Sequence, residues 1–292
     1  MFPRLSVAIM AIVALATVSI APGSAQPAPS ATENITVQGT KSREVIQSFV
    51  GSFATPTRLA DALPRWESGV CPLIMGQPPA IIQIIHQRVR DLAALSGAPV
   101  NNKSSCKPNI EIIFTTTPQE LLDNVREHQP IILGYADSAR ERDRLALVKR
   151  PVQAWYTTQS EDYNGRRRVD ISTTFSDMPT VGGGLSRIRH ALLSSYLNVV
   201  IVADPEKLQD QGIGPLADYI AMLALTQINT LDNCQPLPSI MNLLAKDCAT
   251  KTDMLTINDV TYLHGLYTMR RERNLAAQKG EIADTMLAAL KH

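Results

Sequence analysis

The feature that most constrains this fold is an almost uninterrupted run of apolar and β-branched residues, LNVVIVAD, at residues 197–204. A strand with one solvated face alternates apolar and polar residues, whereas this run has no polar face. The pattern therefore predicts a strand that is buried on both sides. The fold must contain a sheet that other elements cover on both faces.

Three elements are predicted between residues 80 and 128. Residues 80–96, AIIQIIHQRVRDLAALS, have apolar side chains at helical spacing, and Gly97 follows as a stop signal. The predicted inward face consists of Ile81, Ile84, Ile85, Val89, Leu92 and Leu95. The alternating run at residues 108–117 predicts a strand, and Pro118 at a first turn predicts the next helix.

A hairpin and a further helix are predicted before the buried strand. The β-rich runs at residues 152–162 and 166–175 flank Asn164-Gly165, which supplies the positive φ angles that a tight antiparallel turn needs. The run RIRHALLSSYL, at residues 187–197, is interpreted as helical. The order of elements is thus helix, strand, helix, hairpin and buried strand.

The four cysteines predict two disulfides, because an even count in an exported chain favours bridges over free thiols. They occur as Cys71 and Cys106, then Cys234 and Cys248, and four cysteines allow three connectivities. The sequential pairs are the prediction. Zinc is the competing use of cysteine, but the chain has neither a CxxC pair nor a nearby histidine pair.

The first 25 residues have the layout of a secretory signal, with Arg4, an apolar run and small residues before Ala25. This predicts cleavage after Ala25 and a secreted or periplasmic protein; an uncleaved membrane anchor is the alternative, because about 17 apolar residues nearly suffice to span. Cleavage removes one of 28 basic residues and none of 27 acidic ones. The near-neutral mature chain predicts neither a nucleic-acid partner nor a membrane partner.

Three short motifs follow one another in the last third of the chain. They are LADYIAMLAL at residues 216–225, PLPSIMNLL at 236–244 and LTINDVTYLHGLY at 255–267. Together they resemble the active-site helix, methionine turn and closing helix of metzincin-like zinc peptidases, whose helix carries HExxHxxG. In that frame Ala217 and Ala221 stand at the two histidine positions, Asp218 at the glutamate and Ala224 at the glycine, while Met241 lies in the turn.

The resemblance implies an α+β, zincin-like fold: a mixed twisted sheet with packed helices, an active-site-type helix, a methionine-type turn and a closing helix. It implies one domain at residues 43–269, with two subdomains meeting near 215–240. A disordered lead-in at 26–42 and a helical tail at 270–292 are predicted from composition and charge. The alternative for residues 216–225 is an apolar core helix with no catalytic ancestor.

Because both zinc ligands are missing, we predict no metal, no cofactor and no catalytic residue. The favoured function is a secreted, non-catalytic module of a bacterial envelope that binds an unknown peptide or protein. Trp66 and Trp155 are candidates to line its groove, and the hairpin offers an edge strand to an extended peptide. The alternatives are a hydrolase that uses Asp218 and His264, and a structural envelope protein that assembles through its tail.

Overall fold

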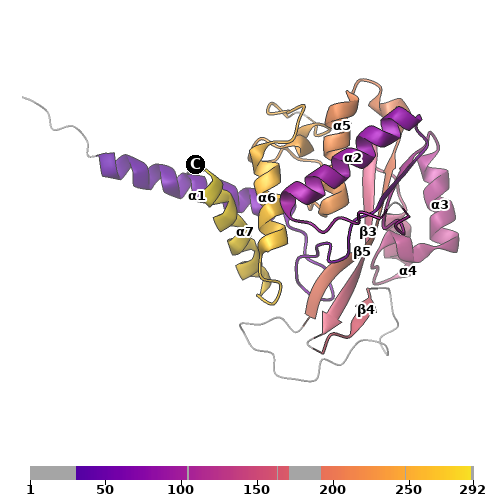
Figure 1. Ribbon diagram of the computed structural model, residues 1–292, viewed down its shortest axis with the longest axis horizontal. Helices are drawn as coiled ribbons and strands as arrows, with labels where there is room; N and C mark the ends of the chain where they lie inside the picture. Colours follow the sequence, from indigo (N-terminus) through magenta and orange to yellow (C-terminus); the bar gives the residue numbers. More distant parts are fainter. Residues whose placement is uncertain (1–30, 104, 163, 171–191, 247, 291–292) are drawn as a thin grey trace, which may run out of the picture. The chain divides into compact units, whose positions relative to one another are not determined.

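The computed structural model of this chain describes residues 31–103, 105–162, 164–170, 192–246 and 248–290 (Figure 1). Side chains are described from Ser42 onward. The predicted signal peptide lies outside the described residues. Contacts divide the chain at Gln38, and everything below concerns the unit from Gly39 to His292.

A five-stranded mixed sheet forms the centre of this unit, in the order β1-β2-β5-β3-β4. Strands β1 (Pro72–Met75), β2 (Ile110–Phe114) and β5 (Leu192–Ala203) run parallel to one another. Strand β3 (Val152–Asp162) is antiparallel to β5, and the short β4 (Arg167–Val169) pairs with the far end of β3. The predicted hairpin and the predicted buried strand are therefore confirmed.

Strand β5 is buried on both faces, as its apolar run predicts. Val199 and Ile201 belong to the main hydrophobic core, whereas Val200 and Val202 belong to a second cluster on the opposite face. All four side chains are at most 5% exposed. Because side chains alternate along a strand, this division places one core on each side of the sheet.

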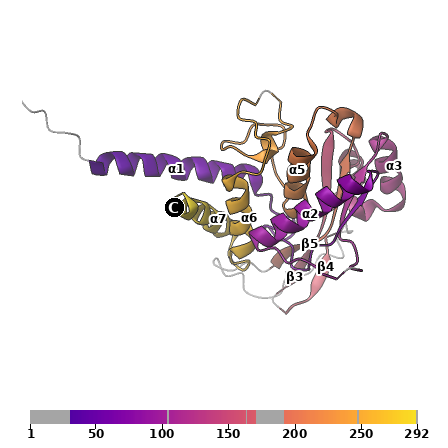
Figure 2. The same cartoon turned by 45° about the horizontal axis from the view of Figure 1, so that its top comes forward.

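Helices α2 (Pro79–Ser96) and α5 (Ile213–Leu225) lie side by side over the face of the main core (Figures 1 and 2). The predicted helix at 80–96 is confirmed, and Gly97 ends it in the left-handed conformation at φ 86°. The prediction of its inward face is partly wrong. Ile84 and Leu95 are 43% and 63% exposed, because α5 covers only the narrower stripe around Ile85.

The opposite face is covered by α3 (Pro118–His128), the short 3-10 helix η1 (Pro130–Leu133) and α4 (Ala139–Leu145). Their apolar side chains pack around Trp155 of β3. The helix predicted to begin at Pro118 is confirmed. Helices thus cover both sides of the sheet, which makes this an α+β unit of three layers.

The chain ends depart from the prediction. Helix α1 (Ala31–Phe53) begins inside the stretch predicted to be disordered, and its apolar stripe from Ile46 to Phe53 joins the main core. At the other end, α7 (Leu275–Ala289) runs unbroken through Gly280. Burial of Ile282 against Gly265 of α6 (Ile257–Thr268) makes the predicted tail part of the folded unit.

The helix predicted at residues 187–197 is wrong from Leu192 onward. Those residues extend β5 and pair with the far end of β3, from Leu192 opposite Asp162 to Tyr196 opposite Thr158. Their helix-forming composition is overridden because pairing with a neighbouring strand satisfies the backbone and buries Ser194 and Ser195. The remainder of that stretch lies outside the described residues.

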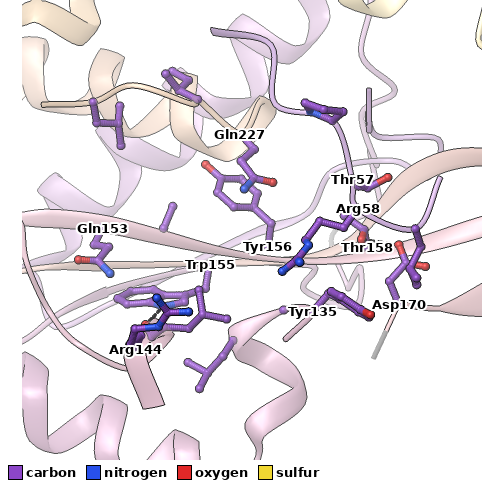
Figure 3. Close-up of a pocket in the computed structure, with 18 of the residues that line it drawn as sticks. Thr57, Arg58, Tyr135, Arg144, Gln153, Trp155, Tyr156, Thr158, Asp170 and Gln227 are labelled. Carbon is purple, nitrogen blue, oxygen red and sulfur yellow. Dashed lines mark hydrogen bonds between the residues drawn. The ribbon is translucent and has the colours of Figure 1, made fainter. Parts of the chain in front are cut away.

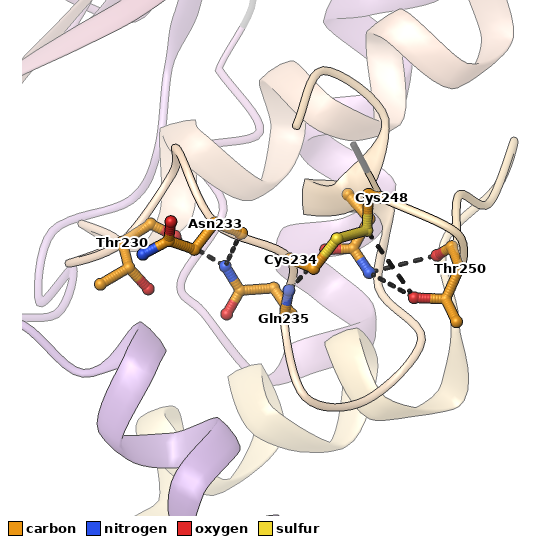
Figure 4. The surroundings of a disulfide bond; sticks show 7 residues. Thr230, Asn233, Cys234, Gln235, Cys248 and Thr250 are labelled. Carbon is orange, nitrogen blue, oxygen red and sulfur yellow. Dashed lines mark hydrogen bonds between the residues drawn. A yellow bond between two sulfur atoms is a disulfide. The ribbon is translucent and has the colours of Figure 1, made fainter. Parts of the chain in front are cut away.

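Both predicted disulfides are confirmed. Cys71 bonds to Cys106, with Cα atoms 6.1 Å apart, and Cys234 bonds to Cys248, at 5.4 Å. The second bridge closes the loop that carries the predicted methionine turn (Figure 4). Nowhere in the described residues is a helix both long enough and apolar enough to cross a membrane.

Candidate functional site

The positions at which the resemblance expects zinc ligands lie in the protein core. Ala217, Ala221 and Ala224 are 0% exposed and belong to the main hydrophobic cluster. They are spaced by four and three residues, so they share one face of α5. This face is packed rather than open, and it leaves no room there for a substrate.

Asp218 occupies the position of the catalytic glutamate, and its carboxylate is held by neighbours in the fold. One oxygen accepts a hydrogen bond from the Leu255 amide at 3.0 Å, and the other forms an ion pair with Arg88 of α2. Burial raises the pKa of Asp218, and the Leu255 amide and Arg88 oppose that rise. With 2% of its side chain exposed, Asp218 links α5 to α2.

The methionine-type turn is fastened to the closing helix. Met241 lies in the 3-10 helix η4 (Ile240–Asn242) and is 0% exposed. Asp259 of α6 accepts hydrogen bonds from the Ser239 hydroxyl at 2.5 Å and from the Ile240 amide at 2.9 Å. The same carboxylate completes a capping box with Thr256. Burial raises the pKa of Asp259, and these donors oppose the rise.

His264 and Asp218, the residues of the alternative hydrolase prediction, have different environments. Its side chain is exposed on α6, whereas Asp218 is buried against Arg88. Base catalysis needs a positioned partner within reach of the same substrate. Within the described part of the chain, no group of three His, Cys, Asp or Glu side chains is placed to hold a metal ion.

A cavity of about 360 Å³ lies elsewhere, beside the hairpin (Figure 3). Its floor is the edge of β3 from Gln153 to Thr158. One wall comes from the loop and helix around Gly134 and Arg144, and the other from the segment after α5 that includes Ile228. The cavity therefore follows the rim of the sheet and does not enter the space beneath α5.

The backbone of β3 is unpaired along this cavity. The Asp204 amide donates to the Pro151 carbonyl at 2.8 Å, so these opposed residues form a hydrogen-bonded pair. Such pairs alternate along an antiparallel ladder, which turns the N–H and C=O groups of Ala154 and Tyr156 away from β5. Among the described residues, that outer side makes no backbone hydrogen bond until the Asp170 amide donates to the Thr158 carbonyl.

Two neighbouring segments contact Tyr156 on this edge strand. The Tyr156 hydroxyl lies 2.8 Å from the Leu223 carbonyl at the end of α5, which fixes the strand against the helix. Gly134, at φ 86°, passes so close that a Cβ there would lie 2.5 Å from the Tyr156 carbonyl oxygen. The loop can approach the edge only because residue 134 is glycine.

The two tryptophans have different environments. Trp155 lines the cavity, but its ring is only 4% exposed and its indole N–H donates to the Leu145 carbonyl at 2.7 Å. Trp66, the other candidate for a groove, lies in the core and donates to the Ala224 carbonyl at 2.8 Å. The prediction for Trp66 is therefore wrong, because its position opposite α5 is set by tertiary packing.

The cavity has basic side chains at its rim. Arg58 is paired with Asp137 and Glu141, and Arg150 with Asp232. Arg144 and Lys149 are both exposed; Lys149 lies near enough to Asp232 to help lower the pKa of that carboxyl, although the close ion pair of Asp232 is with Arg150. Among the described residues that line the cavity, Asp170 is the one acid, and it is 2% exposed. Sequence reasoning missed Arg144 and Lys149, because nothing in their spacing marks them from other surface cations.

Comparisons with known proteins identify no relative of this chain. No family model, no curated protein and no solved structure matches the chain.

Proposed function

We propose that this protein is an exported, non-catalytic binding module that takes up an extended polypeptide as an additional strand on the open edge of β3. The observation that carries the proposal is the outward-facing N–H and C=O of Ala154 and N–H of Tyr156 beside the cavity, since Gly134 already covers the Tyr156 carbonyl. An extended peptide can hydrogen-bond to such an edge, and neighbouring pockets then select its side chains.

The absence of catalysis is part of the proposal. A zincin-like ancestry gives a reason for an edge strand beside a cavity, and the buried alanines of α5 account for the loss of the reaction. Strand addition uses backbone groups, so it does not depend on the missing ligands. The two disulfides agree with an exported protein.

The proposal is tested by fluorescence anisotropy with a labelled peptide of alternating Gln and Val residues. We expect saturable binding, and we expect Ala154→Pro to weaken it by about tenfold or more, because proline removes an N–H that faces the peptide. In contrast, Gln153→Pro removes an N–H that faces β5 and should lower the unfolding temperature.

A second arm leaves the protein unchanged and alters the peptide. Methylation of alternate backbone nitrogens on the peptide removes donors in one register only, so one of the two methylated series should lose affinity and the other keep it. Equal affinity of both series, or unchanged binding by a folded Ala154→Pro variant, overturns the proposal.

A further inference from the structure

The two walls of the cavity differ in chemistry, and the faces of an added strand would differ accordingly. Ala154 and Tyr156 point to the main core and share their side with Ile228 and Leu231. Trp155 points to the opposite face. Figure 3 shows the same division, with Gln227 and Tyr156 on one side of the strand and Arg144 below Trp155 on the other.

The wall on the side of Tyr156 carries three apolar side chains beside Gln227. Ile228 is 7% exposed, and Leu231 and Pro56 are half-buried beside it. Side chains of the ligand that face this wall lose contact with water, so apolar groups are favoured there. A charged side chain on this face would be desolvated without a partner.

The wall on the side of Trp155 is basic. Arg144 lies at the end of α4, and Lys149 lies in the loop that follows. The Lys149 amide donates a hydrogen bond to the Gln153 side chain at 2.9 Å. Both side chains are exposed and line the cavity. Asp170, the only acid among the described residues of the lining, is hydrogen-bonded to Thr158 at 2.6 Å and Ser160 at 2.8 Å, so its oxygens are engaged away from Arg144 and Lys149.

We infer that the ligand is an extended peptide in which acidic and apolar residues alternate, with the acidic ones level with Trp155 and the apolar ones level with Ala154 and Tyr156. The inference rests on the proposed function and adds the class of ligand. Alternation follows from the strand itself, because successive side chains point to opposite faces. The acidic preference follows from the two exposed cations in the lining, Arg144 and Lys149, because the close ion pair of the nearby Asp232 is with Arg150.

Four labelled peptides test this inference by anisotropy at low salt: alternating Glu–Val, alternating Gln–Val, alternating Lys–Val, and a peptide with the Glu and Val residues in two blocks. We expect Glu–Val to bind tightest, several-fold tighter than Gln–Val and about tenfold or more tighter than Lys–Val, and to weaken as salt rises. The block peptide has the same charge and composition, so its weaker binding isolates the alternation.

Charge reversal in the protein supplies the matching arm. The double variant Arg144→Glu/Lys149→Glu should prefer Lys–Val over Glu–Val, and Arg140→Glu, on the same helix but outside the cavity, should keep the order of the wild-type protein. Equal binding of Glu–Val and Gln–Val, or of the block peptide and Glu–Val, overturns this inference while leaving the proposed function standing. Failure of every peptide to bind overturns the proposed function itself.

Discussion

Helix α5 and the edge of β3 meet at Tyr156, yet they offer opposite surfaces. Every residue of α5 from Leu216 to Leu225 is buried, and its polar Asp218 is held by Arg88 and the Leu255 amide. At the other end of the Tyr156 side chain, the backbone of β3 borders a cavity of about 360 Å³. One region is closed by packing, and the other is left open.

A metal site and an edge-strand site place different requirements on the sequence. A metal site depends on a few ligand side chains that face a ligand, whereas Ala217 and Ala221 are 0% exposed within the main core. An edge-strand site depends on backbone groups that every residue except proline carries. Such a surface can persist when the residues around it change.

The largest effect is expected for Ala221→Asp, which places an unpaired carboxylate in the closed region. We expect a loss of about 3 kcal/mol or more in the free energy of unfolding, measured by urea denaturation. The control is Ala80→Asp, an exposed position in the first turn of α2 where an acid is tolerated by the helix dipole. Equal stability of the two variants would mean that α5 has an open face.

An intermediate effect is expected for Gly134→Ala at the border of the open region. Its φ of 86° and ψ of −168° are accessible essentially to glycine alone, and the new Cβ would press on the Tyr156 carbonyl. We expect a loss of about 2 kcal/mol by urea denaturation.

Gly165→Ala is the matched control for that variant. Gly165 also has a positive φ, 77°, but no atom lies within 4 Å of the position that a new Cβ would occupy. Only the cost of the dihedral, about 1 kcal/mol, should therefore appear. If Gly165→Ala costs as much as Gly134→Ala, the close approach of residue 134 to the strand contributes nothing.

The sequence predicted the parts of this fold that depend on local pattern. The apolar run of β5, the Asn164-Gly165 turn and the helix start at Pro118 each carry their structure in a few adjacent residues. The strand from Leu192 was mistaken for a helix because its pairing with β3 is a contact across the chain. The burial of α7 was not predicted for the same reason, because it depends on the tertiary contact of Ile282 with Gly265 of α6.

The sequence predicted the strand of the candidate site but not the residues that form the walls of the cavity. The hairpin and Trp155 could be read from composition and spacing, and so could the expectation that an edge strand lies there. Arg144 and Lys149 come from one segment and Ile228 from another, and only the folded chain brings both segments around Ala154. The grouping of these side chains, from which the class of ligand is inferred, is therefore set by tertiary structure.

The smallest effect is expected from titration of Asp170 at the end of the cavity. Burial raises the pKa of its carboxyl above the ordinary 3.8, against the opposing hydrogen bonds from Thr158 and Ser160. The folded state therefore binds a proton over a window just above pH 3.8 in which the unfolded state has lost it. Wild-type stability relative to Asp170→Asn should rise as pH falls through this window, by on the order of 1 kcal/mol or less.

Thermal unfolding of both proteins between about pH 3.5 and 7 measures that difference. Removing the Ser160 hydroxyl by Ser160→Ala takes away a donor that favours the charged form, so it should widen the window toward higher pH. A difference that stays constant with pH would mean that the hydrogen bonds from Thr158 and Ser160 fully offset the burial of Asp170, and the expected rise of its pKa would be wrong.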